Sequence, residues 1–150
     1  MREAILREAP IRQVHDLIFD RHADLFDRVE LGPPPASFDH AAVSATVTFW
    51  NVERGRHAGA QAALLGAQNA SAHLLCELDL GMARTGQRHT TRDLAERLGC
   101  SYVFGVEFLE LGLGDRREQA AHAGESNEAG LHGAAILSPH PLNRPAVVRL

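Results

Sequence analysis

Two polar side chains follow apolar strand signals at equivalent points in two neighbouring segments of the chain. In the stretch VTFWNV, alternation places Val47, Phe49 and Asn51 on one strand face, so an apolar row ends in an amide. The apolar run AHLLC ends in the same manner at Glu77. Because ligands bind at strand ends in open α/β sheets, the pair indicates a ligand-binding site.

Each of these two residues also has a simpler explanation when it is taken alone. Asn is a common strand terminator and turn former, so the strand could simply stop at Asn51. Glu77 could be a carboxylate in water at the rim of the sheet. Their matching positions in successive strands favour a shared site over these alternatives.

Two arginines follow shortly after Glu77, in the segment GMARTGQRHTT. One interpretation is a loop in which Arg84 and Arg88 bind a substrate phosphate, and the other is a solvated loop. Glu107 lies in the apolar stretch SYVFGVEFLEL and faces away from the neighbouring aromatic side chains. It is either a carboxylate that supports the site or a partly exposed strand residue. A lone His132 at a strand start is typical of a hydrogen-bonded structural residue, and no His or Cys spacing indicates a zinc site.

The elements that would position these residues alternate between strand and helix. Short apolar runs predict strands, and longer segments with helical spacing predict helices between them, which is typical of an α/β domain with helices packed on sheet faces. Thr91 is a suitable N-terminal cap and Gly99 a suitable C-terminal stop for the second helix. The expected strands cover 44–52, 72–80 and 101–111, and the expected helices cover 58–69 and 91–99.

The ends of the chain differ from this alternating pattern. Residues 1–31 form a helical segment that either packs on the domain or binds a partner, with packing preferred, and 32–42 form a Pro-rich linker. The domain then covers 43–150, with a strand expected to begin near Val43. A polar loop follows the third strand and contains a short helix around 116–122, and two strands at 131–142 and 145–150 form an antiparallel pair.

Composition limits the class of protein. The chain of 150 residues is 45% hydrophobic and 23% charged, with a net charge of −4, which is typical of a globular domain and argues against a protein that coats DNA non-specifically. It contains no Lys, and Arg is the better planar fork for phosphate. No apolar run reaches the roughly 20 residues that span a bilayer. The N-terminus MREAILREAPIRQ lacks the apolar core of a signal peptide, so we expect a cytoplasmic protein with Cys76 and Cys100 as free thiols.

Three short motifs resemble those of the endonuclease/exonuclease/phosphatase superfamily. They are WNV at 50–52, ELD at 77–79 and GAAILSPHPL at 133–142, and the similarity covers about residues 44–150. The resemblance implies a two-sheet, four-layer α/β sandwich, of which this chain would be the N-terminal half. It also implies hydrolysis of phosphate esters with Mg²⁺, or with Mn²⁺ as an alternative, on a nucleic acid, a lipid head group or a sugar phosphate.

The resemblance also implies roles for individual residues. The Asn that matches Asn51 helps to hold the phosphate and the catalytic groups, the Glu that matches Glu77 binds the metal, and Glu107 matches a supporting carboxylate. The sequence departs from the superfamily at Ala134, where an Asn is usual. The downstream Asp-x-Asn motif and the terminal Asp-His pair do not occur before Leu150.

These departures lead to two expectations and leave one alternative function. We expect residues 1–150 alone to be inactive and to associate through an unpaired C-terminal strand at 145–150. The alternative is a non-catalytic α/β binding module that recruits a partner through its N-terminal helix.

Overall fold

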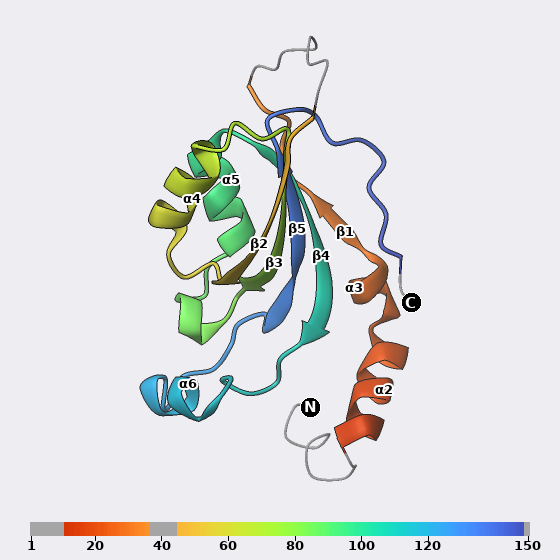
Figure 1. Cartoon of the computed structure of the whole chain (residues 1–150). Helices are drawn as coiled ribbons and strands as arrows, with labels where there is room; N and C mark the ends of the chain where they lie inside the picture. The colour runs from red at the N-terminus through yellow and green to blue at the C-terminus, as the bar shows by residue number, and fades with distance from the viewer. Residues whose placement is uncertain (1–10, 37–44, 149–150) are drawn as a thin grey trace.

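Five strands lie side by side in one mixed sheet, with the order β1-β4-β5-β3-β2 (Figure 1). The structure is a computed structural model that describes residues 11–36 and 45–148. Strands β2 and β3 are parallel, and the other neighbouring pairs are antiparallel. The strands are β1 (Val29–Leu31), β2 (Val47–Arg54), β3 (Ala72–Leu80), β4 (Ser101–Leu109) and β5 (Leu131–Ser138). The expected α/β class is therefore confirmed, and the expected strand start near Val43 lies outside the described residues.

Two helices, α4 (Ala58–Gly66) and α5 (Thr90–Leu98), cover one face of the sheet (Figure 1). Gly99 ends α5 in the left-handed conformation with φ 64°, as expected. The expected cap at Thr91 is wrong, because His89 occupies the cap position and its ring accepts a hydrogen bond from the backbone N–H of Arg92. The core between helices and sheet contains Val52, Ala62, Leu65, Leu75, Leu94, Ala95, Tyr102, Phe104, Ala135 and Leu137.

The N-terminal segment packs on its own domain. Helices α2 (Ile11–Arg21) and α3 (Ala23–Asp27) are followed by β1, which pairs with β4 as an edge strand. Ile18 and Phe26 are buried, so packing is confirmed for this segment. The segment is not wholly helical, since it also supplies a strand. No helix in the described parts of the chain is long and apolar enough to cross a membrane.

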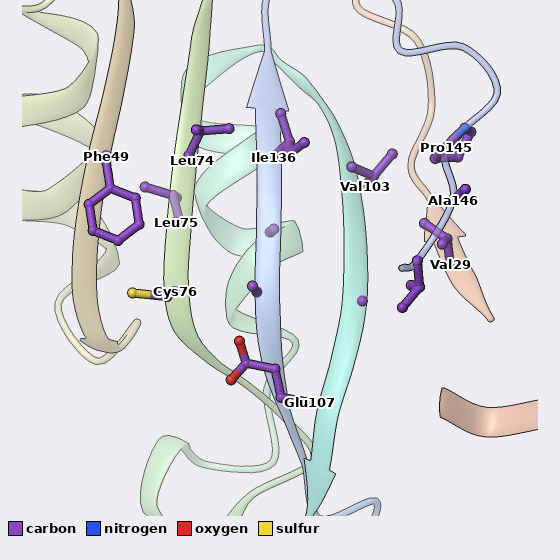
Figure 2. A pocket seen from close by; sticks show the side chains of 14 residues that line it. Val29, Phe49, Leu74, Leu75, Cys76, Val103, Glu107, Ile136, Pro145 and Ala146 are labelled. Atoms are coloured by element: carbon purple, nitrogen blue, oxygen red, sulfur yellow. The ribbon is translucent and has the colours of Figure 1, made fainter. Parts of the chain in front are cut away.

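Within residues 11–36 and 45–148, no pair of helices such as α4 and α5 covers the second face of the sheet (Figure 1), and this face exposes apolar side chains. Phe49 is 73% exposed and Val47 is 54% exposed on β2. A cavity of about 480 Å³ lies on this face between the strands and the coil 145–147, and Figure 2 shows Phe49, Ile136 and Glu107 around it. The apolar row of β2 therefore lies on the open face, whereas Val52 on the opposite face belongs to the core.

Two expectations about the C-terminal half differ from the structure. The described residues hold one sheet, so the two-sheet sandwich is not confirmed. Residues 145–148 form no strand, and the expected antiparallel pair with 131–142 is wrong. The reason is that β5 lies in the middle of the sheet, where β3 and β4 already occupy both of its hydrogen-bonding edges. Residues 145–148 therefore offer no unpaired strand through which two chains could associate.

Gly133 tests how tightly β5 is held in the middle of the sheet. A Cβ atom at Gly133 would lie 2.1 Å from the carbonyl oxygen of Gly105 on β4, and backbone in a sheet cannot move away cheaply. We expect Gly133→Ala to lower the free energy of unfolding, measured by urea titration, by about 1–3 kcal/mol or more. Gly59→Ala is the control, because Gly59 lies in α4 with no atom within 4 Å of a Cβ there. It should be neutral or stabilise by up to about 1 kcal/mol, and equal effects at both sites would contradict this prediction.

Candidate functional site

Asn51 and Glu77 meet at the ends of the adjacent strands β2 and β3. The Nδ2 group of Asn51 donates a hydrogen bond of 2.6 Å to Oε1 of Glu77, although 26 residues separate the two in sequence. The two strands are parallel, so their carboxyl ends lie at the same edge of the sheet. The predicted approach of these two side chains is confirmed, while their roles in binding stay predictions.

Irregular backbone shapes both strands at this point. The register between β2 and β3 shifts between Asn51 and Arg54, and the β3–β5 register shifts between Leu75 and Leu78. Three non-glycine residues here have left-handed backbone angles, Glu53 with φ 46°, Arg54 with φ 65° and Glu77 with φ 60°. Such angles cost about 1–3 kcal/mol each, and in proteins they concentrate at functional sites.

The bulge in β2 directs Arg54 toward Glu77. The Oδ1 atom of Asn51 accepts a hydrogen bond of 3.0 Å from the backbone N–H of Glu53, which closes a turn through the side chain. Arg54 then donates from Nη1 to Oε2 of Glu77 over 2.9 Å. Both oxygens of Glu77 consequently have a partner, one an amide and the other a guanidinium group.

A second carboxylate, Glu118, lies on the short helix α6 (Arg116–Ala121) and contacts Arg54, the arginine that also contacts Glu77. Asp115 caps α6 by accepting from the N–H groups of Arg117 and Glu118, and the Glu118 side chain accepts from the backbone of Asp115. The short helix expected in this loop is thus confirmed. Glu118 is 7% exposed and forms ion pairs with three arginines, which are Arg54, Arg56 and Arg84.

Arg84 occupies a buried position, unlike the exposed loop expected from the sequence. It lies in the 3₁₀ helix η1 (Ala83–Thr85), and its side chain is 3% exposed. It donates to both oxygens of Asp79, from Nε over 2.7 Å and from Nη2 over 2.8 Å. Its Nη1 group lies 2.7 Å from Glu110 and 3.4 Å from Glu118. Because carboxylates surround its guanidinium group, we do not propose Arg84 as a substrate-binding residue.

Buried charges around Asp79 stabilise one another. Burial disfavours the charged form of Asp79, but hydrogen bonds from Arg84 and His132 outweigh it and lower the pKa of Asp79. Burial likewise disfavours the charged form of Arg84, yet Asp79, Glu110 and Glu118 raise its pKa above the ordinary value. His132 Nδ1 lies 2.7 Å from Asp79 Oδ1, so the structural role expected for His132 is confirmed.

The other two predicted residues, Arg88 and Glu107, lie in two different surroundings. Arg88 is 41% exposed and pairs with Asp93 over 2.6 Å, so its contact with a substrate stays a prediction. Glu107 lies on the open face beside the cavity (Figure 2), where the β4–β5 register shifts. Burial raises the pKa of the Cys76 thiol, and the charges of Glu77 and Glu107 raise it further. A catalytic role for Glu107 stays a prediction.

The residues at the site allow one mode of metal binding. Among the described residues, no group of three or more His, Cys, Asp or Glu side chains converges to hold a metal ion. Mg²⁺ is commonly bound through one or two carboxylates, water and the phosphates of the substrate. Glu77, whose side chain is 35% exposed, fits as the single protein carboxylate of such an arrangement.

Sequence reasoning missed Arg54, Arg56 and Glu118. The signal for the two arginines was the run ERGR, which follows Asn51 directly at the end of β2. Glu118 carried no such signal, because its contact with Arg56 spans 62 residues. Comparisons with protein families, with curated proteins and with solved structures found no match. The superfamily resemblance therefore still depends on the three short sequence motifs.

The burial of Arg84 leads to a stability prediction. Removing one partner of a buried ion pair leaves the others uncompensated, so we expect Arg84→Met to lower the free energy of unfolding by about 3–5 kcal/mol. Arg88→Met is the matched control in the same segment, and it should stay within about 0.5 kcal/mol of the wild type. Urea unfolding at pH 7 measures both variants. Equal stability of the two variants would show that the Arg84 ion pairs contribute little.

The lowered pKa of Asp79 leads to a prediction about pH. Because its pKa in the folded state lies below the ordinary value of 3.8, ionised Asp79 stabilises the fold fully above that pH, and this stabilisation is lost as the pH falls through the lower folded-state value. Asp79→Asn should therefore be less stable than the wild type at pH 7, and the difference should narrow below about pH 4. Urea unfolding between pH 2.5 and 7 measures the difference, and a constant gap would contradict the assignment.

Proposed function

We propose that this chain takes part in the divalent-metal-dependent hydrolysis of phosphate esters, with Glu77 as the metal ligand and Asn51 as a phosphate-positioning residue. The observation that supports this proposal most directly is the hydrogen bond between Asn51 and Glu77 at the bulged ends of two parallel strands. A strained junction that aims an amide and a carboxylate at one point is typical of a site rather than of a strand that merely ends.

The contacts of Asn51 prepare it for this role. Its Oδ1 atom accepts from the backbone of Glu53, and one N–H of Nδ2 donates to Glu77, so the orientation of the amide is fixed. The second N–H of Nδ2 can donate to a phosphate oxygen. A neutral amide does this without adding charge beside Glu77.

Glu77 supplies the hard oxygen that Mg²⁺ prefers, with Mn²⁺ as the alternative ion. When bound, such an ion would polarise the phosphoryl group and stabilise the leaving oxygen. The residues of this chain would orient the phosphate, and Glu107 keeps the role of a supporting carboxylate in this proposal. The substrate class stays a nucleic acid, a lipid head group or a sugar phosphate, and the cytoplasm stays the expected compartment.

A non-catalytic binding module is the second candidate, and the open sheet face is the observation that favours it. Phe49 and Val47 of β2 are 73% and 54% exposed there, and contiguous exposed apolar side chains mark interaction surfaces. The N-terminal helical segment, which the sequence suggested as the partner-binding site, is a weaker candidate for that site, because Ile18 of α2 and Phe26 of α3 are buried against the domain. A partner would therefore bind the apolar face rather than α2.

Metal binding separates the two candidates. We expect the chain to bind Mn²⁺, and Glu77→Gln to weaken that binding at least about tenfold in calorimetric titrations, because the neutral amide is a poorer ligand for a hard cation. Glu96→Gln, on the exposed side of α5, is the control and should bind as the wild type does. Equal Mn²⁺ affinity in Glu77→Gln and the wild type would reject the metal site. Binding is the readout because it tests Glu77 as a metal ligand directly.

A further inference from the structure

We infer that Arg54 and Arg56 form the phosphate-binding side of this site, and that Arg54 exchanges Glu77 for the phosphate when a divalent cation binds. This inference rests on the proposed function and deepens it, since it names the residues that recognise the substrate. The sequence suggested Arg84 for phosphate binding, and we assign this role to Arg54 and Arg56 instead.

Both arginines come from one turn that follows Asn51. Arg54 reaches Oε2 of Glu77 over 2.9 Å and lies 3.1 Å from Oε1 of Glu118, which Arg56 also contacts. The turn itself is fixed: Gly55 has φ 68°, and a Cβ atom there would lie 2.6 Å from the side chain of Thr90 on α5. Close packing of Gly55 against α5 thus holds Arg54 beside Glu77 and Arg56 beside Glu118.

The contacts of these arginines are easier to exchange than those of Arg84. Arg84 is buried and makes two aligned hydrogen bonds to Asp79, so moving it would leave a buried charge without a partner. Arg54 and Arg56 are 27% and 33% exposed, and the Nε atom of each is buried without a hydrogen-bond partner among the described residues. The contact of Arg54 Nε with Glu118 is therefore Coulombic and poorly aligned. In the pair that would exchange, Arg54 and Glu77 are 27% and 35% exposed, and partly exposed ion pairs of this kind contribute little.

Charge explains why the exchange depends on a cation. In the structure, three arginines and four carboxylates form one connected network, so its net charge is about −1 before a cation binds; the members are Arg54, Arg56, Arg84, Glu77, Asp79, Glu110 and Glu118. A divalent cation on Glu77 would repel Arg54 and leave an excess of positive charge at this edge of the sheet. A phosphate group restores the balance, and the planar guanidinium group matches its oxygens in pairs. Cation and phosphate should therefore strengthen each other's binding by the same factor.

The test measures two ligands by calorimetry, Mn²⁺ and inorganic phosphate, on the full chain. For the wild type, phosphate should bind at least about tenfold more tightly when Mn²⁺ is present. Arg54→Gln and Arg56→Gln should each weaken phosphate binding at least about tenfold in the presence of Mn²⁺. Arg54→Gln should at the same time bind Mn²⁺ alone as tightly as the wild type or more tightly, because a competing cation has been removed. Loss of structure would weaken both ligands together, so these opposite changes identify the role.

Two further variants make the result decisive. Arg97→Gln, an exposed arginine on α5, should leave both affinities unchanged. Arg54→Lys keeps the charge without the planar fork and should bind phosphate with intermediate affinity, which covers the case in which Arg54→Gln does not fold.

The outcomes separate the inference from the proposed function. If the wild type binds Mn²⁺ through Glu77 but phosphate affinity is the same in Arg54→Gln and Arg56→Gln, the inference is wrong and the proposed function stands. If the wild type does not bind Mn²⁺, the proposed function and the coupled exchange are both wrong. Phosphate titrations without metal then test the two arginines alone, and equal affinities in wild type and variants would reject them as well.

Discussion

The guanidinium group of Arg84 lies buried against the carboxylate of Asp79, and the segments at the carboxyl ends of the strands are arranged around this ion pair. Asp79 belongs to β3, Arg84 to η1, and His132 to β5, so a single charged cluster ties three parts of the chain together. Isolated charges at this depth would be very costly, and each of them therefore requires the others. Glu110 and Glu118 complete the cluster by contacting Nη1 of Arg84.

The same cluster extends outward to the candidate site. Glu118 contacts Arg84 on the buried side and Arg54 and Arg56 on the exposed side. Its position on α6 therefore links the buried ion pairs to the turn that follows β2. Arg54 then contacts Glu77, which in turn accepts from Asn51. Interactions are strong and aligned where the cluster is buried, and weaker where it reaches solvent. This gradient suits a site whose scaffold must stay fixed while its outermost side chains exchange partners.

The two faces of the sheet show a similar division. Helices α4 and α5 cover one face and bury Val52, Leu75 and Leu137, whereas the other face leaves Phe49 exposed. Part of this open face is covered by the coil after β5, since Val147 packs over Gly105. An apolar row such as Val47 and Phe49 is ordinarily read as a core face, and alternation cannot tell which of two apolar faces the helices choose. Here the helices lie on the side of Val52.

Local patterns in the sequence determined strands β2 to β5, the helices, the stop at Gly99 and the short helix with Glu118, because each depends on residues close together in the chain. They also determined that Asn51 and Glu77 meet, since residues at the ends of successive parallel strands share one edge of a sheet. Tertiary structure alone decided that β5 lies in the middle of the sheet, which denied 145–148 a partner strand. It also decided which arginine is buried. Asp79 lies only five residues before Arg84, but Glu118 is 34 residues from Arg84 and Glu77 is 23 residues from Arg54, so these contacts depend on strand order and packing rather than on any local pattern.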